Sequence, residues 1–149
     1  MLERCLIFLE NLLKNMIELF ERIVNKLLEM YGSNLLYVSI LNTTRQPSLM
    51  SDLELLIILE SYTDNVIEEC SKIRRTLLND VGICVEPYVY SIDDVCKIFE
   101  SRRLMLSILG GIMPLYQDGR FNIRRILCEC AIPMTSSPYV DAVREILCS

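Results

Sequence analysis

Three carboxylates in this chain have the residue types and the spacing of a metal site. Asp52 and Glu54 stand one residue apart at the start of an apolar run. Because side chains alternate across a strand, both would point to the same face of a sheet. Glu86 lies in a later segment of β-like composition, ICVEPYVY (83–90). If the two strands are neighbours in register, the three carboxylates meet where a buried strand begins.

Clustered carboxylates repel one another, and a divalent cation removes that repulsion. Mg²⁺ prefers carboxylates together with water and substrate phosphates. Two such ions about 3.5–4 Å apart can activate a hydroxyl and stabilise a leaving pyrophosphate. The acids therefore indicate metal-dependent phosphoryl or nucleotidyl transfer. Taken singly, each acid also fits a plain structural position: Asp52 and Glu54 at a solvated strand end, and Glu86 on an edge strand, where Pro87 is tolerated.

The composition limits the classes of function. The chain has 149 residues, 52% of them hydrophobic, which suffices for one domain with a sizeable core. Its net charge is −5. A nucleic-acid-binding surface needs clustered basic residues, so we expect no nucleic-acid partner. The absence of histidine excludes Ser–His and Cys–His catalysis.

The seven cysteines indicate the cellular compartment. They contain one close pair, where a zinc site usually needs two. Their odd number, with no secretory signal, predicts a cytoplasmic protein with mostly free thiols.

An apolar seam at heptad spacing follows residues 2–30 and predicts a long amphipathic helix. Charged residues interrupt it too often for a membrane span, so we expect no membrane association. Two alternatives remain for this helix. Either it packs along its whole length as a core helix, or its first half projects and pairs with another chain. The wide stripe suits a bundle of four helices.

The rest of the pattern alternates strands and helices. The first two strands have a short connection, so we expect them to be antiparallel neighbours. The order of elements predicts an α/β (α+β) fold with a mixed sheet flanked by helices. We expect strands over 35–41, 51–60, 83–90 and 112–116, and helices over 63–79, 91–109, 122–130 and 137–147.

In this order the segments resemble the minimal nucleotidyltransferases of the polymerase-beta superfamily. That family has a strand, Gly-Ser, a polar connection, Ser-Asp-x-Asp leading into an apolar strand, and a third acid in a later strand. The stretches LLYVSILNTTRQPSLMSDLELLIILE and GICVEPYVYS follow that layout, and LGGIMPLYQDG is similar to the end of the family's core. The resemblance covers about residues 20–119.

The resemblance implies a nucleotidyltransferase-like sheet within a single domain. It divides the chain into a long helix for oligomerisation (1–30), a nucleotidyltransferase-like core (31–119) and C-terminal helices (120–149). The implied activity transfers a nucleoside monophosphate from ATP or another NTP to an acceptor hydroxyl, with two Mg²⁺ ions.

The resemblance also implies roles for single residues. Asp52 and Glu54 would bind both metals, and Glu86 would hold the catalytic metal and help activate the acceptor.

Three further residues would bind the nucleotide. Ser39 would contact the triphosphate, and Ser51 precedes the acids. Arg45, in the connection, would neutralise phosphate charge or serve as an ordinary loop arginine. The expected partners are a helical protein and a second copy of the chain.

The chain also departs from the family's motif. Val38 stands where the family has the glycine that lets the backbone turn tightly. Glu54 and Glu86 replace aspartates, and misplacing a ligand by 1 Å can cost about 10²-fold in rate. An alternative is therefore a catalytically decayed nucleotidyltransferase fold that acts as a dimeric interaction or regulatory module. A third is an unrelated α/β domain whose acids converge by accident.

Overall fold

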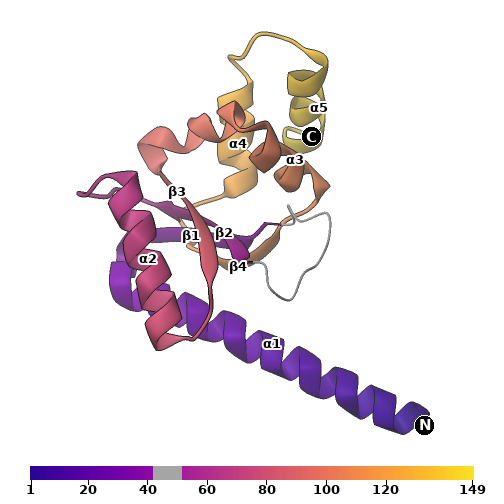
Figure 1. The fold of residues 1–149 in the computed structure, drawn as a ribbon. Coiled ribbons are helices and arrows are strands. Elements are labelled where there is room, and N and C mark those ends of the chain that lie inside the picture. Colours follow the sequence, from indigo (N-terminus) through magenta and orange to yellow (C-terminus); the bar gives the residue numbers. More distant parts are fainter. Residues whose placement is uncertain (42–51) are drawn as a thin grey trace.

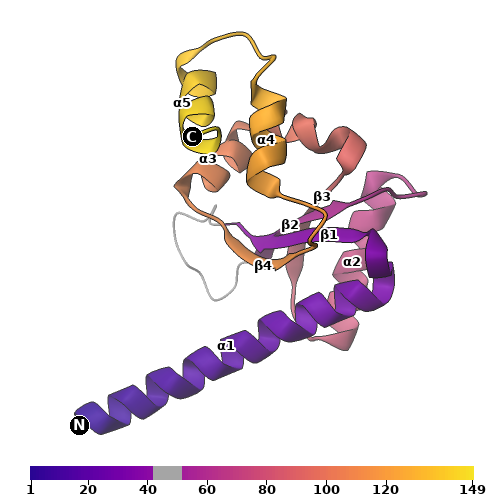
Figure 2. The same cartoon turned by 180° about the vertical axis from the view of Figure 1, so that it is seen from behind.

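The computed structural model describes residues 1–41 and 52–149 and has a four-stranded mixed sheet between two layers of helices (Figures 1 and 2). The elements are α1 Leu2–Tyr31, β1 Leu35–Ile40, β2 Leu53–Leu59, α2 Val66–Asp80, β3 Val85–Ser91, the 3₁₀ helix η2 Ile92–Glu100, α3 Arg102–Gly110, β4 Met113–Gln117, α4 Ile123–Ala131 and α5 Pro138–Leu147.

The strands are ordered β3-β2-β1-β4. β1 pairs antiparallel with both β2 and β4, whereas β2 pairs parallel with β3. The predicted fold class, a mixed sheet flanked by helices with a long N-terminal helix, is confirmed. So is the antiparallel pairing of the first two strands.

Strand β2 is buried on both faces, because Leu55–Leu59 is an unbroken apolar run and every residue in it is 0% exposed. Its odd-numbered residues pack on α1 and α2, where Ile23 and Leu27 face Ile73 and Leu77 across the core. Its even-numbered residues, Leu56 and Ile58, pack on the layer built from η2, α3, α4 and α5. The sheet therefore needs a helical layer on each side.

The helix predicted over 91–109 is wrong in its continuity, because the chain forms two helical segments there. The 3₁₀ helix η2 ends at Glu100, and α3 begins at Arg102. Between them Ser101 has an extended backbone, and its hydroxyl accepts a hydrogen bond from the Leu104 N–H at 3.2 Å. A serine that caps a helix in this way favours a new start over continuation.

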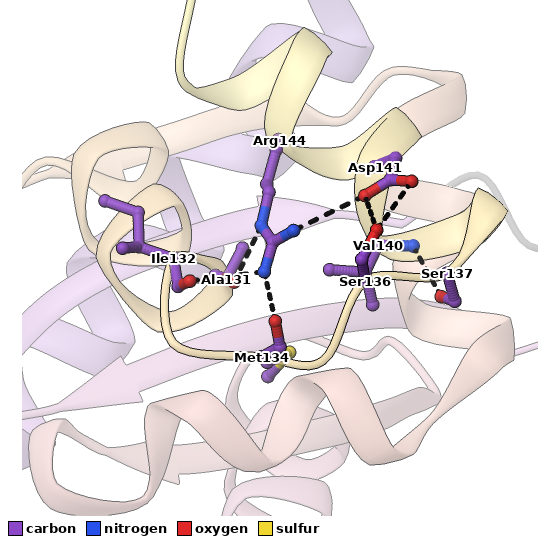
Figure 3. Close-up of polar contacts among 8 residues, drawn as sticks. All are labelled: Ala131, Ile132, Met134, Ser136, Ser137, Val140, Asp141 and Arg144. Carbon is purple, nitrogen blue, oxygen red and sulfur yellow. Dashed lines mark hydrogen bonds and ion pairs between the residues drawn. The ribbon is translucent and has the colours of Figure 1, made fainter.

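The C-terminal helices are tied together by Arg144 of α5 (Figure 3). Its guanidinium donates to the carbonyls of Ala131 at 3.1 Å and Ile132 at 3.2 Å, and also to that of Met134. Asp141, on the same helix, lies 3.4 Å from Arg144 and accepts a hydrogen bond from the Ser136 hydroxyl at 2.7 Å. Arg144 thus caps the carbonyls at the end of α4 and in the turn that follows it.

Two disulfides add to this connection, so the expectation of mostly free thiols is wrong. Cys96 of η2 is bonded to Cys130 of α4, and Cys128 of α4 to Cys148 after α5. Cys5, Cys70 and Cys84 are free. The tertiary fold brings together cysteines that are 34 and 20 residues apart, which spacing alone did not indicate.

The end of α1 is anchored to α2 by a partly buried hydrogen bond. The Tyr31 hydroxyl donates to Glu69 at 2.7 Å, and Glu69 is only 3% exposed. Lys72 lies 3.6 Å from the same carboxylate. Burial, together with the hydrogen bond to Glu69, raises the pKa of Tyr31 well above its ordinary value. Tyr31 therefore stays protonated in the folded protein at pH values where it ionises in the unfolded chain.

Replacing Tyr31 by phenylalanine should lower the free energy of unfolding by about 1–2 kcal/mol at neutral pH, because Glu69 loses a buried donor. The difference should shrink as pH rises above about 10, since the unfolded wild-type chain then releases the Tyr31 proton and is stabilised by linkage. Urea denaturation at several pH values measures both effects. Tyr62→Phe is the matched control, because its hydroxyl contacts Asp94 at 3.3 Å near the surface. Equal losses in the two variants would contradict the anchoring role of Tyr31.

Candidate functional site

The parallel pairing of β2 and β3 places Glu54 directly opposite Glu86. Both lie on the face of the sheet that α3 covers, because Glu54 is two residues from Leu56, which packs in the core beneath that helix. Asp52 precedes β2 and is exposed. The two strands are thus neighbours in register, which is the arrangement that convergence of the three acids requires. We call these three residues the acid face.

Each glutamate of the acid face is paired with an arginine. A carboxylate oxygen of Glu54, Oε1, forms an ion pair with Arg103 of α3, whose side chain is 59% exposed while that of Glu54 is 10% exposed. On the edge strand, Glu86 Oε1 lies 2.9 Å from Arg74 of α2. Within residues 1–41 and 52–149, no three acidic or cysteine side chains lie close enough together to hold a metal ion.

The second oxygen of Glu54 has a different environment. Oε2 is buried, and it accepts no hydrogen bond from any described residue. Tyr88 stands two residues beyond Glu86 on β3, and burial raises the pKa of its hydroxyl. The charge of Glu54 raises that pKa further, and Arg103 opposes it. Glu54 therefore retains one unsatisfied oxygen in the partly buried space beneath α3.

Two nucleotide-binding residues implied by the resemblance, Arg45 and Ser51, lie outside the described residues. The third, Ser39, is on β1 and is 0% exposed, so a ligand from solvent does not reach it in this arrangement.

Strand β1 continues without a turn through the position of the family's glycine. Val38 pairs with Ile57 and Tyr116 on its two sides. Its side chain is fully buried and packs in the core formed with α1 and α2, on the side of the sheet opposite the acid face. Where the resembled motif has a tight Gly-Ser turn, this chain has a strand whose pairing with β4 shifts register between Val38 and Ser39.

Arg103 and Arg74 are the residues at this site that sequence reasoning missed. In the sequence, Arg74 is a charged residue outside the apolar face of its helix, and Arg103 is one of two consecutive arginines. Neither carries a local signal, because their partners are 49 and 12 residues away. Only the packing of the helices on the sheet brings them to the acids.

Replacing Arg103 by alanine should lower the free energy of unfolding by roughly 1–3 kcal/mol, because a buried carboxylate loses its charged donor. The exposure of the arginine keeps the loss below that of a fully buried pair. Arg102→Ala on the same helix is the control, since Arg102 is exposed. Chemical denaturation of wild type, R103A, E54Q and the double variant measures the coupling. Additive losses from the two changes would mean that the ion pair contributes nothing to stability.

A second candidate surface is the first half of α1, which projects away from the sheet (Figure 1). We call its seam residues the α1 stripe, and they are 41–75% exposed: Leu2, Leu6, Leu9, Leu13 and Met16. The same seam continues into the domain, where Ile23 and Leu27 are fully buried. Among the described residues, no helix combines the length and apolar character that crossing a membrane requires. The stripe is therefore an apolar surface presented on a helix that no described part of the chain covers.

The fold and these surfaces together define a mixed α+β protein with an arginine-paired acid face and a projecting amphipathic helix. The sequence matches no protein-family model, and the comparison with curated proteins gave no match.

Among solved structures, the chain is similar to an MntA–HepT toxin–antitoxin structure at a TM-score of 0.48 and 12% identity, over 76% of this chain and 82% of that one. A variant of that complex with two aspartate-to-glutamate substitutions gives a TM-score of 0.46 at 12% identity, over 72% of this chain and 80% of that one. At this level of similarity, neither the activity nor the partners of those proteins transfer to this chain.

Proposed function

We propose that the protein is a dimeric interaction module in which two copies associate through the first half of α1. The exposed α1 stripe is the observation that carries this proposal. Soluble monomers rarely present a contiguous apolar patch larger than a few hundred Å², and larger ones mark interaction sites. Burying one leucine side chain fully is worth about 1.5–3 kcal/mol, so covering five seam residues on each copy is a strong driving force.

The pattern of the stripe supports a helical occupant. Its residues alternate at spacings of four and three, which is the spacing that fits the knobs of one helix into the holes of another. A second copy supplies such a helix without any further component. A different helical protein with the same seam is the competing occupant, and the mass of the purified chain distinguishes the two.

The acid face supports a binding role more than a catalytic one. Glu54 and Glu86 are each neutralised by an arginine of the same chain. A divalent ion would have to displace both arginines before it could use both glutamates. The covering of this face by α3 is consistent with a regulatory or interaction protein built on the fold of an enzyme.

Replacing Leu9 and Leu13 together by glutamate should convert the dimer to a monomer, because it puts four charges into the apolar contact of the pair. Both residues are exposed in the single chain, at 50% and 58%, so the circular dichroism spectrum should not change. Sedimentation equilibrium measures the mass.

The control is Asn11→Glu, which adds charge on the outward face of the same turn and should leave the dimer intact. A wild-type chain that sediments as a monomer would contradict the proposal. So would a double variant that remains a dimer.

A second candidate function is Mg²⁺-dependent nucleotidyl transfer from ATP or another NTP. The observation that favours it is the register of Glu54 against Glu86, with Asp52 two residues upstream. The unsatisfied Oε2 of Glu54 is a further ligand atom that faces no described donor. Bound Mg²⁺ would supply charge neutralisation for the phosphates. The residues as arranged do not fit two metal ions, because arginines hold both glutamates.

Titration of the chain with a non-hydrolysable ATP analogue and Mg²⁺ tests this candidate by calorimetry. Catalysis requires binding at or below millimolar nucleotide and its loss in Asp52→Asn. R103A should bind Mg²⁺ more tightly than wild type, because it frees Glu54. R102A is the control for a change of net charge. The candidate function fails if wild type and D52N behave alike.

A further inference from the structure

We infer that the two copies pair with their α1 helices antiparallel, centred on Asn11, so that the N-terminus of each copy reaches the domain of the other. This inference rests on the self-association proposed above and specifies its geometry. It follows from where the seam of α1 is free and where it is already covered.

The covered half of the seam excludes a parallel pair. From Ile23 onward, the seam that is exposed in the first half of α1 packs against the sheet of its own domain, with Ile23 and Leu27 at 0% exposed. A parallel second helix in contact with the stripe would continue along the same side of α1. It would enter the volume that the sheet occupies. An antiparallel helix instead ends there, because its N-terminus arrives where the domain begins.

The heptad positions then fix the register. In an antiparallel pair, a-position residues of one helix pack against d-position residues of the other. With a at Leu6, Leu13 and Phe20, and d at Leu2, Leu9 and Met16, one register uses every exposed seam residue. Leu6 meets Met16 of the second copy, Leu13 meets its Leu9, and Phe20 meets its Leu2. The two-fold axis of this arrangement passes at the level of Asn11.

A cavity lies where this register places the end of the second helix. It occupies about 250 Å³ between α1 and β4, and its lining includes the apolar Ile17, Phe20, Val24 and Leu115 and the polar Glu21 and Asn25. The projecting half of α1 thus ends at a partly apolar hollow beside Phe20. Leu2 of the second copy is the side chain that the register brings to it. In a monomer, Leu2 is 75% exposed.

The contact area includes side chains beyond the stripe. Leu12 and Ile17 lie on the two flanks of the seam and are 45% and 56% exposed. The pair would bury them together with the stripe, where a standard interface buries roughly 800 Å² per partner. A two-fold contact of this kind is isologous and closes at two copies.

One local feature opposes this register. Glu10 lies on the flank of the seam close to the two-fold axis, so the two copies bring like charges together there. Exposed like-charged pairs on helices cost only a few tenths of a kcal/mol. The overlap of a parallel helix with the sheet is a steric conflict, which is far larger. Burial and steric fit therefore decide the orientation.

Distances between spin labels on the two copies test the orientation. Arg4, Asn11 and Glu18 are exposed and one heptad apart, so they share the outward face of α1. Each is replaced by a labelled cysteine in a chain whose free Cys5, Cys70 and Cys84 are changed to serine. In the antiparallel pair, the separation along the axis should be smallest at position 11 and larger by about 21 Å at positions 4 and 18, from the 1.5 Å rise per residue.

Pulsed electron paramagnetic resonance gives the three distances. Leu9→Glu in each labelled chain should abolish the dipolar coupling between the labels of the two copies. Equal distances at the three positions in a dimer would overturn the antiparallel inference while leaving the proposed self-association intact. A monomeric mass would overturn both. A dimer whose coupling persists with Leu9→Glu would place the contact on another surface and also overturn the inference.

Discussion

The burial of β2 on both faces is the constraint on which the rest of the structure depends. A strand whose residues are apolar on two sides has to be covered twice, once for each side of the sheet. The C-terminal half of α1 and helix α2 form one cover, and the helices η2, α3, α4 and α5 form the other. The split helix at Ser101 and the disulfides of the C-terminal segment belong to the second of these layers.

The cover over the even-numbered side also determines what the acid face can do. Glu54 lies near the beginning of β2, just before the unbroken apolar run. The helix that buries Leu56 therefore also approaches the Glu54 carboxylate. Arg103 lets α3 make that approach without leaving the charge uncompensated. Arg103 thus pairs with one of the two carboxylate oxygens of Glu54. The packing of α3 therefore stabilises the second layer and at the same time limits access to Glu54.

Much of the fold could be read from the sequence, because its signals are local. The heptad seam of α1, the apolar run of β2 and the alternation in β3 each predict their element within a few residues, and Asn65, Asn122 and Ser137 cap helices as such residues usually do. The sequence also indicated that Glu54 and Glu86 would lie close together if their strands were neighbours in register.

The arginine partners and the disulfides were not predictable in the same way. Arg103 is 49 residues from Glu54 along the chain, and its position depends on how α3 lies over the sheet. The break at Ser101 was missed because a serine inside an apolar periodic pattern fits a continuous helix equally well. Long-range pairing and the competition between capping and continuation are properties of the packed chain.

Because Val38 is buried, a single substitution to glycine would not give this chain a Gly-Ser turn. A glycine at this position would remove a fully buried branched side chain from the core against α1 and α2, at a cost of several kcal/mol from the cavity alone. It would also loosen the middle of a strand that pairs on both edges. Because proteins are only marginally stable, a loss of this size would unfold the chain. A glycine at this position would therefore first require larger side chains elsewhere in the core, which fill the space that Val38 leaves.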